Sequence, residues 1–252
     1  MKIYHGTAER HLGSILKNGI EPRALTKNSN WKKYRSRTDM VYLTTAYSIF
    51  FAFNTVRDGE KLVVVEVDFE KLDKDQLYPD EDVVAQAMSR QMGKSLDDVH
   101  PIARANLEAN KSKWDASLRA MGTVAHSGTV PLGAITRYAL IDRKKRADFI
   151  FSAIDTTISL MAFQFMGQFY LDTTLWLMGD RAELPHVGTA RTEKTLFEAK
   201  KGDKAFDEMA VACDKRVAFW SAESARREGI DVVNVTGVAK RSKERSKERM
   251  NA

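Results

Sequence analysis

The sequence predicts an α+β fold, in which a sheet is followed by a mostly helical extension. Two observations support this class. Over the first 142 residues, short β-branched segments alternate with short helical patterns, and residues 62–69 form the clearest strand. From Ala147 onward the pattern changes to long apolar helical stretches. We therefore expect an N-terminal domain over residues 1–142, a helical extension over 143–239 and a basic tail over 240–252.

The composition is that of an ordinary folded, soluble protein. Of its 252 residues, 43% are hydrophobic and 29% are charged, and this length allows one large domain or two small ones. The chain opens on strand-like residues without a basic-then-apolar leader, so we expect a cytoplasmic protein. The single cysteine, Cys213, cannot form an internal disulfide or supply a cysteine-rich metal site, and is expected to be a small buried hydrophobe.

The formal charge of +6 is unevenly distributed. Residues 240–252 carry six basic and two acidic side chains, so most of the excess lies in the tail. We expect this tail to be a solvated or frayed helix end rather than a dedicated nucleic-acid arm. Affinity of the remaining chain for a polyanion must come from local patches. Two are present, namely Lys32, Lys33, Arg35 and Arg37 in one loop and Arg143-Lys144-Lys145-Arg146 after a predicted strand.

The N-terminal elements can be placed from turn and cap signals. Residues 3–5 form a short strand, and Thr7 is expected to cap a helix that ends at Asn18-Gly19, because glycine readily takes the left-handed conformation at a helix end. The segment from 21 to 40 is polar, basic and aperiodic. It predicts a long surface loop, and such loops in compact domains often carry function.

The later elements alternate between strands and helices. The acidic triplet Asp80-Glu81-Asp82 is expected to begin a helix that runs to about Gln91. Carboxylates are favourable in the first turn because they meet the positive end of the helix. Residues 149–178 are strongly apolar but interrupted by polar side chains, so we expect a pair of core helices rather than a membrane span. The other expected elements are strands at 41–44, 122–126, 134–141 and 232–235, and helices at 46–54, within 95–121 and within 187–228.

Three N-terminal motifs carry a resemblance to a known family. Tyr4-His5-Gly6-Thr7, then Ile15-Leu16-Lys17-Asn18-Gly19-Ile20, then Val41-Tyr42-Leu43-Thr44 resemble the start of the ADP-ribosyltransferase superfamily. This superfamily includes poly(ADP-ribose) polymerases, nucleic-acid-modifying toxins and tRNA 2′-phosphotransferases. The resemblance spans the first 142 residues and is most specific over the first 54. It implies a split, mainly antiparallel sheet that binds NAD without a Rossmann fold.

The resemblance also implies roles for individual residues. His5 is expected to bind the ribose beside the nicotinamide, the backbone of Gly6 to hold the carboxamide, and Thr7 to supply a supporting hydroxyl. Tyr42 matches the second-strand tyrosine of the polymerase-like branch, and Phe53 falls where that branch keeps a stacking aromatic. The implied NAD-binding residues are His5, Gly6, Thr7, Arg37, Tyr42, Thr44 and Phe53.

Structural roles compete with these assignments. His5 and Tyr42 could be core residues, and at least one ring of the aromatic run 50–53 must be, because a short helix cannot turn all its rings toward one ligand. Arg35 and Arg37 could be solvated loop charges. However, they lie just before the second strand, where related enzymes position NAD phosphates or nucleic acid.

The catalytic acid departs from the family pattern. Many transferases place a glutamate in a late strand, but residues 121–128 contain no carboxylate. Three explanations stay open. The acid comes from elsewhere in the chain, the chemistry proceeds with arginine and histidine as in the phosphotransferase branch, or the site binds without turnover.

We favour Glu81 as the acid, because acidic residues are concentrated at that loop-to-helix junction. A carboxylate beside the developing sugar cation would stabilise it, as in glycoside cleavage. The other candidates are Asp82, Asp115 and Glu66. His126 could polarise or deprotonate an acceptor, although with five histidines in the chain a structural role competes.

Other motif classes are missing from the sequence. It contains no Gly-x-Gly-x-x-Gly after a strand, no P-loop and no His-Glu-x-x-His, and no metal site is predicted. We expect an NAD-dependent ADP-ribosyltransferase, an enzyme of the glycosyltransferase class, with nucleic acid favoured over protein as acceptor because the loop and the tail are basic. The alternatives are an RNA 2′-phosphotransferase with NAD as phosphate acceptor, or a catalytically silent module that binds nucleic acid or protein. No membrane partner is expected.

Overall fold

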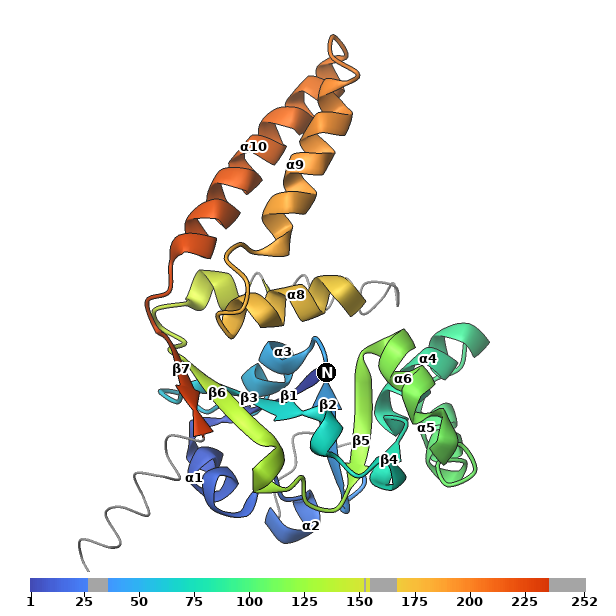
Figure 1. Cartoon of the computed structure of the whole chain (residues 1–252). Helices are drawn as coiled ribbons and strands as arrows, with labels where there is room; N and C mark the ends of the chain where they lie inside the picture. Colours follow the sequence, from blue (N-terminus) through green and yellow to red (C-terminus); the bar gives the residue numbers. More distant parts are fainter. Residues whose placement is uncertain (27–35, 152, 155–166, 236–252) are drawn as a thin grey trace, which may run out of the picture.

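The fold is organised around one antiparallel sheet. The computed structural model describes residues 1–26, 36–151, 153–154 and 167–235 (Figure 1). The expected basic tail, and Lys32, Lys33 and Arg35 of the loop patch, lie outside this range. Seven strands are arranged in the order β4-β5-β2-β1-β3-β6-β7, which confirms the α+β class. The strands are β1 (Lys2–Ala8), β2 (Met40–Thr44), β3 (Leu62–Asp68), β4 (Leu77–Tyr78), β5 (Thr123–Ser127), β6 (Ile135–Ile141) and β7 (Ile230–Asn234).

The sheet is interrupted at its centre. Strand β1 pairs with β3 along its whole length, from Lys2↔Asp68 to Ala8↔Leu62. On its other side β1 pairs with β2 only at Tyr4↔Thr44, so the two strands diverge beyond that point. In the divergent part, the side chain of His5 in β1 lies 3.0 Å from the backbone oxygen of Tyr42 in β2. This divergence opens a gap inside the sheet rather than at its edge.

The helices cover both faces of the sheet and extend beyond it. They are α1 (Glu9–Asn18), α2 (Arg23–Thr26), α3 (Ser48–Phe53), α4 (Glu81–Met92), α5 (Leu96–Ala105), α6 (Trp114–Met121), α8 (Gly167–Leu177), α9 (Pro185–Glu198) and α10 (Lys204–Ala225). Single 3₁₀ turns occupy Phe69–Lys71, Lys74–Gln76, Lys111–Lys113 and Leu132–Ala134. None of the helices within the described ranges combines the length and the apolar character needed to cross a membrane.

Helix ends follow the sequence signals in two cases and depart from them in one. Gly19 ends α1 at φ 88°, and the Asp80 side chain caps α4 by accepting from the backbone N–H groups of Asp82 and Val83, both as predicted. The predicted cap at Thr7 is wrong. Because β1 stays paired with β3 through Ala8, Thr7 remains in the strand and α1 begins at Glu9 without a side-chain cap.

The extension packs on the same face of the sheet as α3. Strand β3 is buried on both faces because its residues alternate between two cores. One core joins β3 to α1, and the other joins β3 to α3 and to extension residues such as Trp176, whose ring lies 4.9 Å from that of Phe149. The predicted late strand is present as β7, so the extension also adds a strand to one edge of the sheet. Helices α9 and α10 form a hairpin that projects away from the sheet (Figure 1), with Cys213 buried as expected.

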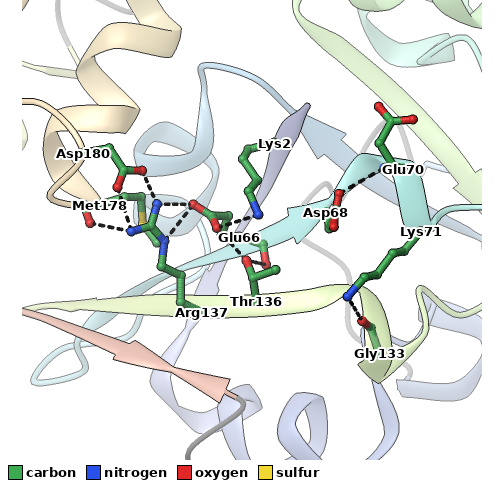
Figure 2. Close-up of polar contacts among 10 residues, drawn as sticks. All are labelled: Lys2, Glu66, Asp68, Glu70, Lys71, Gly133, Thr136, Arg137, Met178 and Asp180. Atoms are coloured by element: carbon green, nitrogen blue, oxygen red, sulfur yellow. Dashed lines mark hydrogen bonds and ion pairs between the residues drawn. The ribbon is translucent and has the colours of Figure 1, made fainter.

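An ion-pair network anchors the extension to the sheet (Figure 2). Glu66 of β3 is almost fully buried and accepts from Arg137 Nε at 2.8 Å and from Thr136 Oγ1 at 2.5 Å. Arg137 Nη1 in turn donates to Asp180 Oδ1 of the extension at 2.9 Å. Lys2 Nζ also lies 3.4 Å from Glu66. This carboxylate, one of the candidate acids, is therefore bound within a structural network.

Candidate active site

A cavity of about 390 Å³ lies where β1 and β2 diverge. This volume falls within the ~300–1,000 Å³ range of small-molecule sites. Its wall comes from β1, α1, α2, the segment before β2, β2 itself, α3 and α4. The polar residues that line it include His5, Thr7, His11, Ser14, Glu21, Arg23, Ser36, Arg37, Tyr42, Asp80, Asp82, Gln86 and Arg90.

The imidazole of His5 bridges the diverging strands. Its Nδ1 lies 3.0 Å from the backbone oxygen of Tyr42, and a carbonyl oxygen can only accept, so Nδ1 carries the proton. Burial, and next the neighbouring His11, lower the pKa of His5, while the Tyr42 carbonyl partly opposes this. The ring is therefore neutral at pH 7. Its Nε2 keeps a lone pair that can accept a hydrogen bond from a ligand.

Gly6 allows a helix to pack directly on β1. A Cβ added at Gly6 would lie 2.0 Å from the backbone oxygen of Ser48 and 2.7 Å from the backbone nitrogen of Ala52, both in α3. Only a residue without a side chain permits this approach. The position of α3, and with it the position of the rings that α3 carries, depends on this glycine.

Two of the three phenylalanines of α3 line the cavity. Phe50 and Phe51 contribute to its wall, with ring centroids 5.6 Å apart. Phe53 does not line the cavity. Its ring lies 5.7 Å from that of Phe151, and the guanidinium of Arg143 lies 5.0 Å above it. Phe51 and Phe53 are separated by about 200° around the helix, so they cannot face the same side.

Tyr42 is held by a buried carboxylate. The Tyr42 hydroxyl donates to Glu81 Oε1 at 2.5 Å. The backbone N–H of Arg37 donates to the Tyr42 hydroxyl oxygen and to Glu81 Oε1, each at 3.1 Å. Glu81 is fully buried, and its Oε2 has no hydrogen-bond partner among the described residues. Burial, and next the charge of Asp82, raise the pKa of Glu81. Glu81 does not line the cavity and instead fixes the Tyr42 ring.

The two neighbouring carboxylates do line the cavity. Asp80 caps α4, and burial, followed by the charges of Asp82 and Glu81, raises its pKa well above the usual value. Asp82 Oδ2 accepts from Ser36 Oγ at 2.5 Å, and its Oδ1 lies 2.8 Å from Nε2 of His100. The start of α4 thus brings carboxyl groups to the cavity wall.

Three guanidinium groups supply positive charge. Arg37 is already paired, with Nε 3.0 Å from Asp39 Oδ1 and Nη1 3.2 Å from Glu108 Oε1. Arg23 donates from Nη2 to the backbone oxygen of Ser36, and its buried Nε has no hydrogen-bond partner among the described residues. Arg23 lines the cavity, where its guanidinium group can donate to an anion. Arg90 adds a third positive group to the wall.

The remaining predicted residues lie elsewhere. Thr44 is buried and does not line the cavity, since its Oγ1 donates to the Gly122 backbone oxygen at 2.9 Å and accepts from two N–H groups in the turn that leads into α3. His126 is buried in β5, with Nδ1 3.4 Å from the backbone oxygen of Gly128, and is also outside the cavity wall. Asp115 pairs with Arg119 in α6.

The structure therefore brings together five of the seven implied NAD-binding residues. His5, Gly6, Thr7, Arg37 and Tyr42 line the cavity, whereas Glu81 supports it from behind Tyr42.

Several cavity residues were not predicted. His11, Arg23, Ser36 and Arg90 belong to no motif, and only their place in the fold brings them to the cavity. For His11 a weak signal exists, since it lies one helical turn before Ile15 on the face of α1 that meets the sheet.

The sequence matches no protein-family model, and no curated protein is significantly similar to it.

Proposed function

We propose that the chain is an NAD-dependent ADP-ribosyltransferase that acts on a macromolecular acceptor, with nucleic acid favoured over protein. The observation that carries this proposal is the cavity between β1 and β2, where His5, Tyr42 and the rings of Phe50 and Phe51 meet. His5 and Tyr42 were predicted for this site, whereas Phe50 and Phe51 take the place in the cavity wall that was expected of Phe53.

The sugar side of the substrate fits the β1 wall. A neutral His5 whose Nδ1 is engaged by Tyr42 presents Nε2 as an acceptor for a ribose hydroxyl. Thr7, two residues further along the same strand, adds a hydroxyl to the same wall. These groups would fix the ribose without changing their own protonation.

The nicotinamide ring and the pyrophosphate of the substrate fit the other walls. The nicotinamide ring of NAD is positively charged, and the faces of Phe50 and Phe51 can attract such a ring. Arg23 and Arg90 can contact the pyrophosphate, which joins the two riboses, because guanidinium groups bind phosphate oxygens with paired donors.

The basic residues support a nucleic acid as the acceptor. The tail at 240–252 is strongly basic, and arginines line the cavity. Neutralising phosphates with such side chains supplies most of the non-specific affinity for nucleic acid. Protein acceptors remain the competing outcome of the experiment below.

The experiment uses NAD labelled on adenine, incubated with the protein and with RNA, DNA or a protein mixture in parallel. We expect label on nucleic acid. His5→Ala should weaken NAD binding about 2- to 12-fold, the range for one neutral hydrogen bond of ~0.5–1.5 kcal/mol. His126→Ala is the matched control, because it also removes an imidazole from a central strand but lies outside the cavity. Equal binding by both variants would contradict the role of His5.

A second candidate is RNA 2′-phosphotransfer with NAD as phosphate acceptor. It is supported by the two histidines and three arginines in the cavity, the residue types on which that chemistry relies. Release of ADP-ribose 1″,2″-cyclic phosphate from 2′-phosphorylated RNA would favour this activity over ADP-ribosylation. If NAD neither binds nor is consumed, a silent binding module is the better description.

A further inference from the structure

We infer that Asp82 is the catalytic carboxylate of this site, an assignment that rests on the proposed function. Of the three acids at the start of α4, Glu81 does not line the cavity, and its Oε1 is occupied by Tyr42 and Arg37. Asp80 lines the cavity but is only 3% exposed, and its Oδ1 caps α4. Asp82 lines the cavity with a side chain that is 20% exposed.

Asp82 is held in place from two sides. Ser36, in the segment before β2, donates to its Oδ2, and the buried His100 of α5 lies against its Oδ1. Each carboxylate oxygen has one such neighbour and keeps further lone pairs. Preorganised charge of this kind stabilises a transition state because it needs no reorganisation during the reaction.

The electrostatic surroundings of Asp80 and Glu81 act in the same direction. Burial, and next the charge of Asp82, raise the pKa values of both Asp80 and Glu81, which favours their neutral forms. Tyr42 and His5 line the same cavity as Asp82. A cationic sugar held by His5 would therefore lie in a cavity whose wall also carries the carboxyl group of Asp82.

The proposed step requires no covalent bond to the protein. The bond between ribose C1′ and the nicotinamide nitrogen breaks, and its electron pair leaves with the nicotinamide, which becomes neutral. Asp82 stabilises the resulting oxocarbenium-like sugar by its charge. The acceptor then attacks C1′ and releases one proton. With water as acceptor, the products are ADP-ribose, nicotinamide and that proton.

The test compares Asp82→Asn with Glu81→Gln in the full chain. Nicotinamide release gives kcat, and titration with NAD gives Kd. Losing one preorganised electrostatic group lowers kcat about 100- to 1,000-fold, and we expect this for Asp82→Asn, with Kd changed less than about threefold. Glu81→Gln should lower kcat less than about tenfold, because the amide can still accept from Tyr42. Asp115→Asn, outside the cavity, is the control and should match the wild type.

The outcomes separate this inference from the proposed function. A folded Asp82→Asn protein with kcat within tenfold of wild type overturns the assignment while leaving the transferase proposal intact. A larger loss in Glu81→Gln than in Asp82→Asn overturns it as well. A wild-type protein that releases no nicotinamide with any acceptor overturns both. If circular dichroism shows that Asp82→Asn does not fold, Asp82→Glu decides, since displacing the charge by one methylene should still lower kcat more than tenfold.

Discussion

The contact between Gly6 and α3 allows a sharp test of how the site is built. In Gly6→Ala the new methyl would lie 2.0 Å from the backbone oxygen of Ser48, whereas ordinary contact begins near 3.4 Å. Neither the oxygen nor the nearby Ala52 nitrogen belongs to a flexible side chain, so α3 must move by about 1 Å or the strand must bend. Overpacking of this kind destabilises a protein by roughly 1–3 kcal/mol, and occasionally by more. We expect about 3 kcal/mol.

Urea denaturation measures the free energy of unfolding, and NAD titration measures the site. Displacing α3 moves Phe50 and Phe51, so NAD affinity should fall together with stability. Gly13→Ala is the control, because Gly13 lies in α1 with no atom within 4 Å of its added Cβ. Alanine there should stabilise the protein by up to ~1 kcal/mol through helix propensity. A Gly6→Ala protein within 1 kcal/mol of wild type, with unchanged NAD affinity, would refute the reasoning.

Three further predictions concern the network, pH and the phosphate contact. Glu66→Gln should lower the unfolding free energy in urea by about 3 kcal/mol, near the lower bound for breaking a buried ion pair, because its arginine partner keeps Asp180; a loss below 1 kcal/mol would contradict the network. Burial lowers the pKa of His186 from 6.5 to about 4. The part of the unfolding free energy that depends on a neutral His186 is therefore present above pH 6.5. It is lost as pH falls toward 4, by up to about 3 kcal/mol. His186→Phe should flatten this part of the measured stability profile, and an unchanged slope would exclude His186 as its source. Arg23→Gln should weaken NAD binding about 10-fold or more, the loss of one charge-assisted hydrogen bond, whereas Arg10→Gln, outside the cavity, should leave the titrated Kd unchanged.

The sequence predicts elements best where one local force dominates. Strand β3 was expected at 62–69 and is found at Leu62–Asp68, because a β-branched run buried on two faces has few other options. Gly19 and Asp80 act through a single backbone preference and a single cap, and both end or begin helices as predicted. Strand β4, only two residues long, carries no periodic signal and was missed.

The site was less predictable because it depends on tertiary placement. The motif residues His5 and Tyr42 were placed in advance by their neighbours in the chain. The choice between Phe51 and Phe53 depended on how α3 is rotated against β1, which no local pattern determines. Arg23 belongs to α2 and Arg90 to α4, and only the assembled fold brings both to one cavity.

The shared core beneath α3 bears on how the chain can be shortened. A fragment that ended near residue 142 would lose β7 from the sheet edge and leave the underside of α3 without Trp176 and its neighbours. Water would then wet the surface that holds the aromatic wall of the cavity from behind. The C-terminal half thus supports α3 from behind, although all the residues that line the cavity belong to the N-terminal half. Experiments on the cavity should therefore use the whole chain.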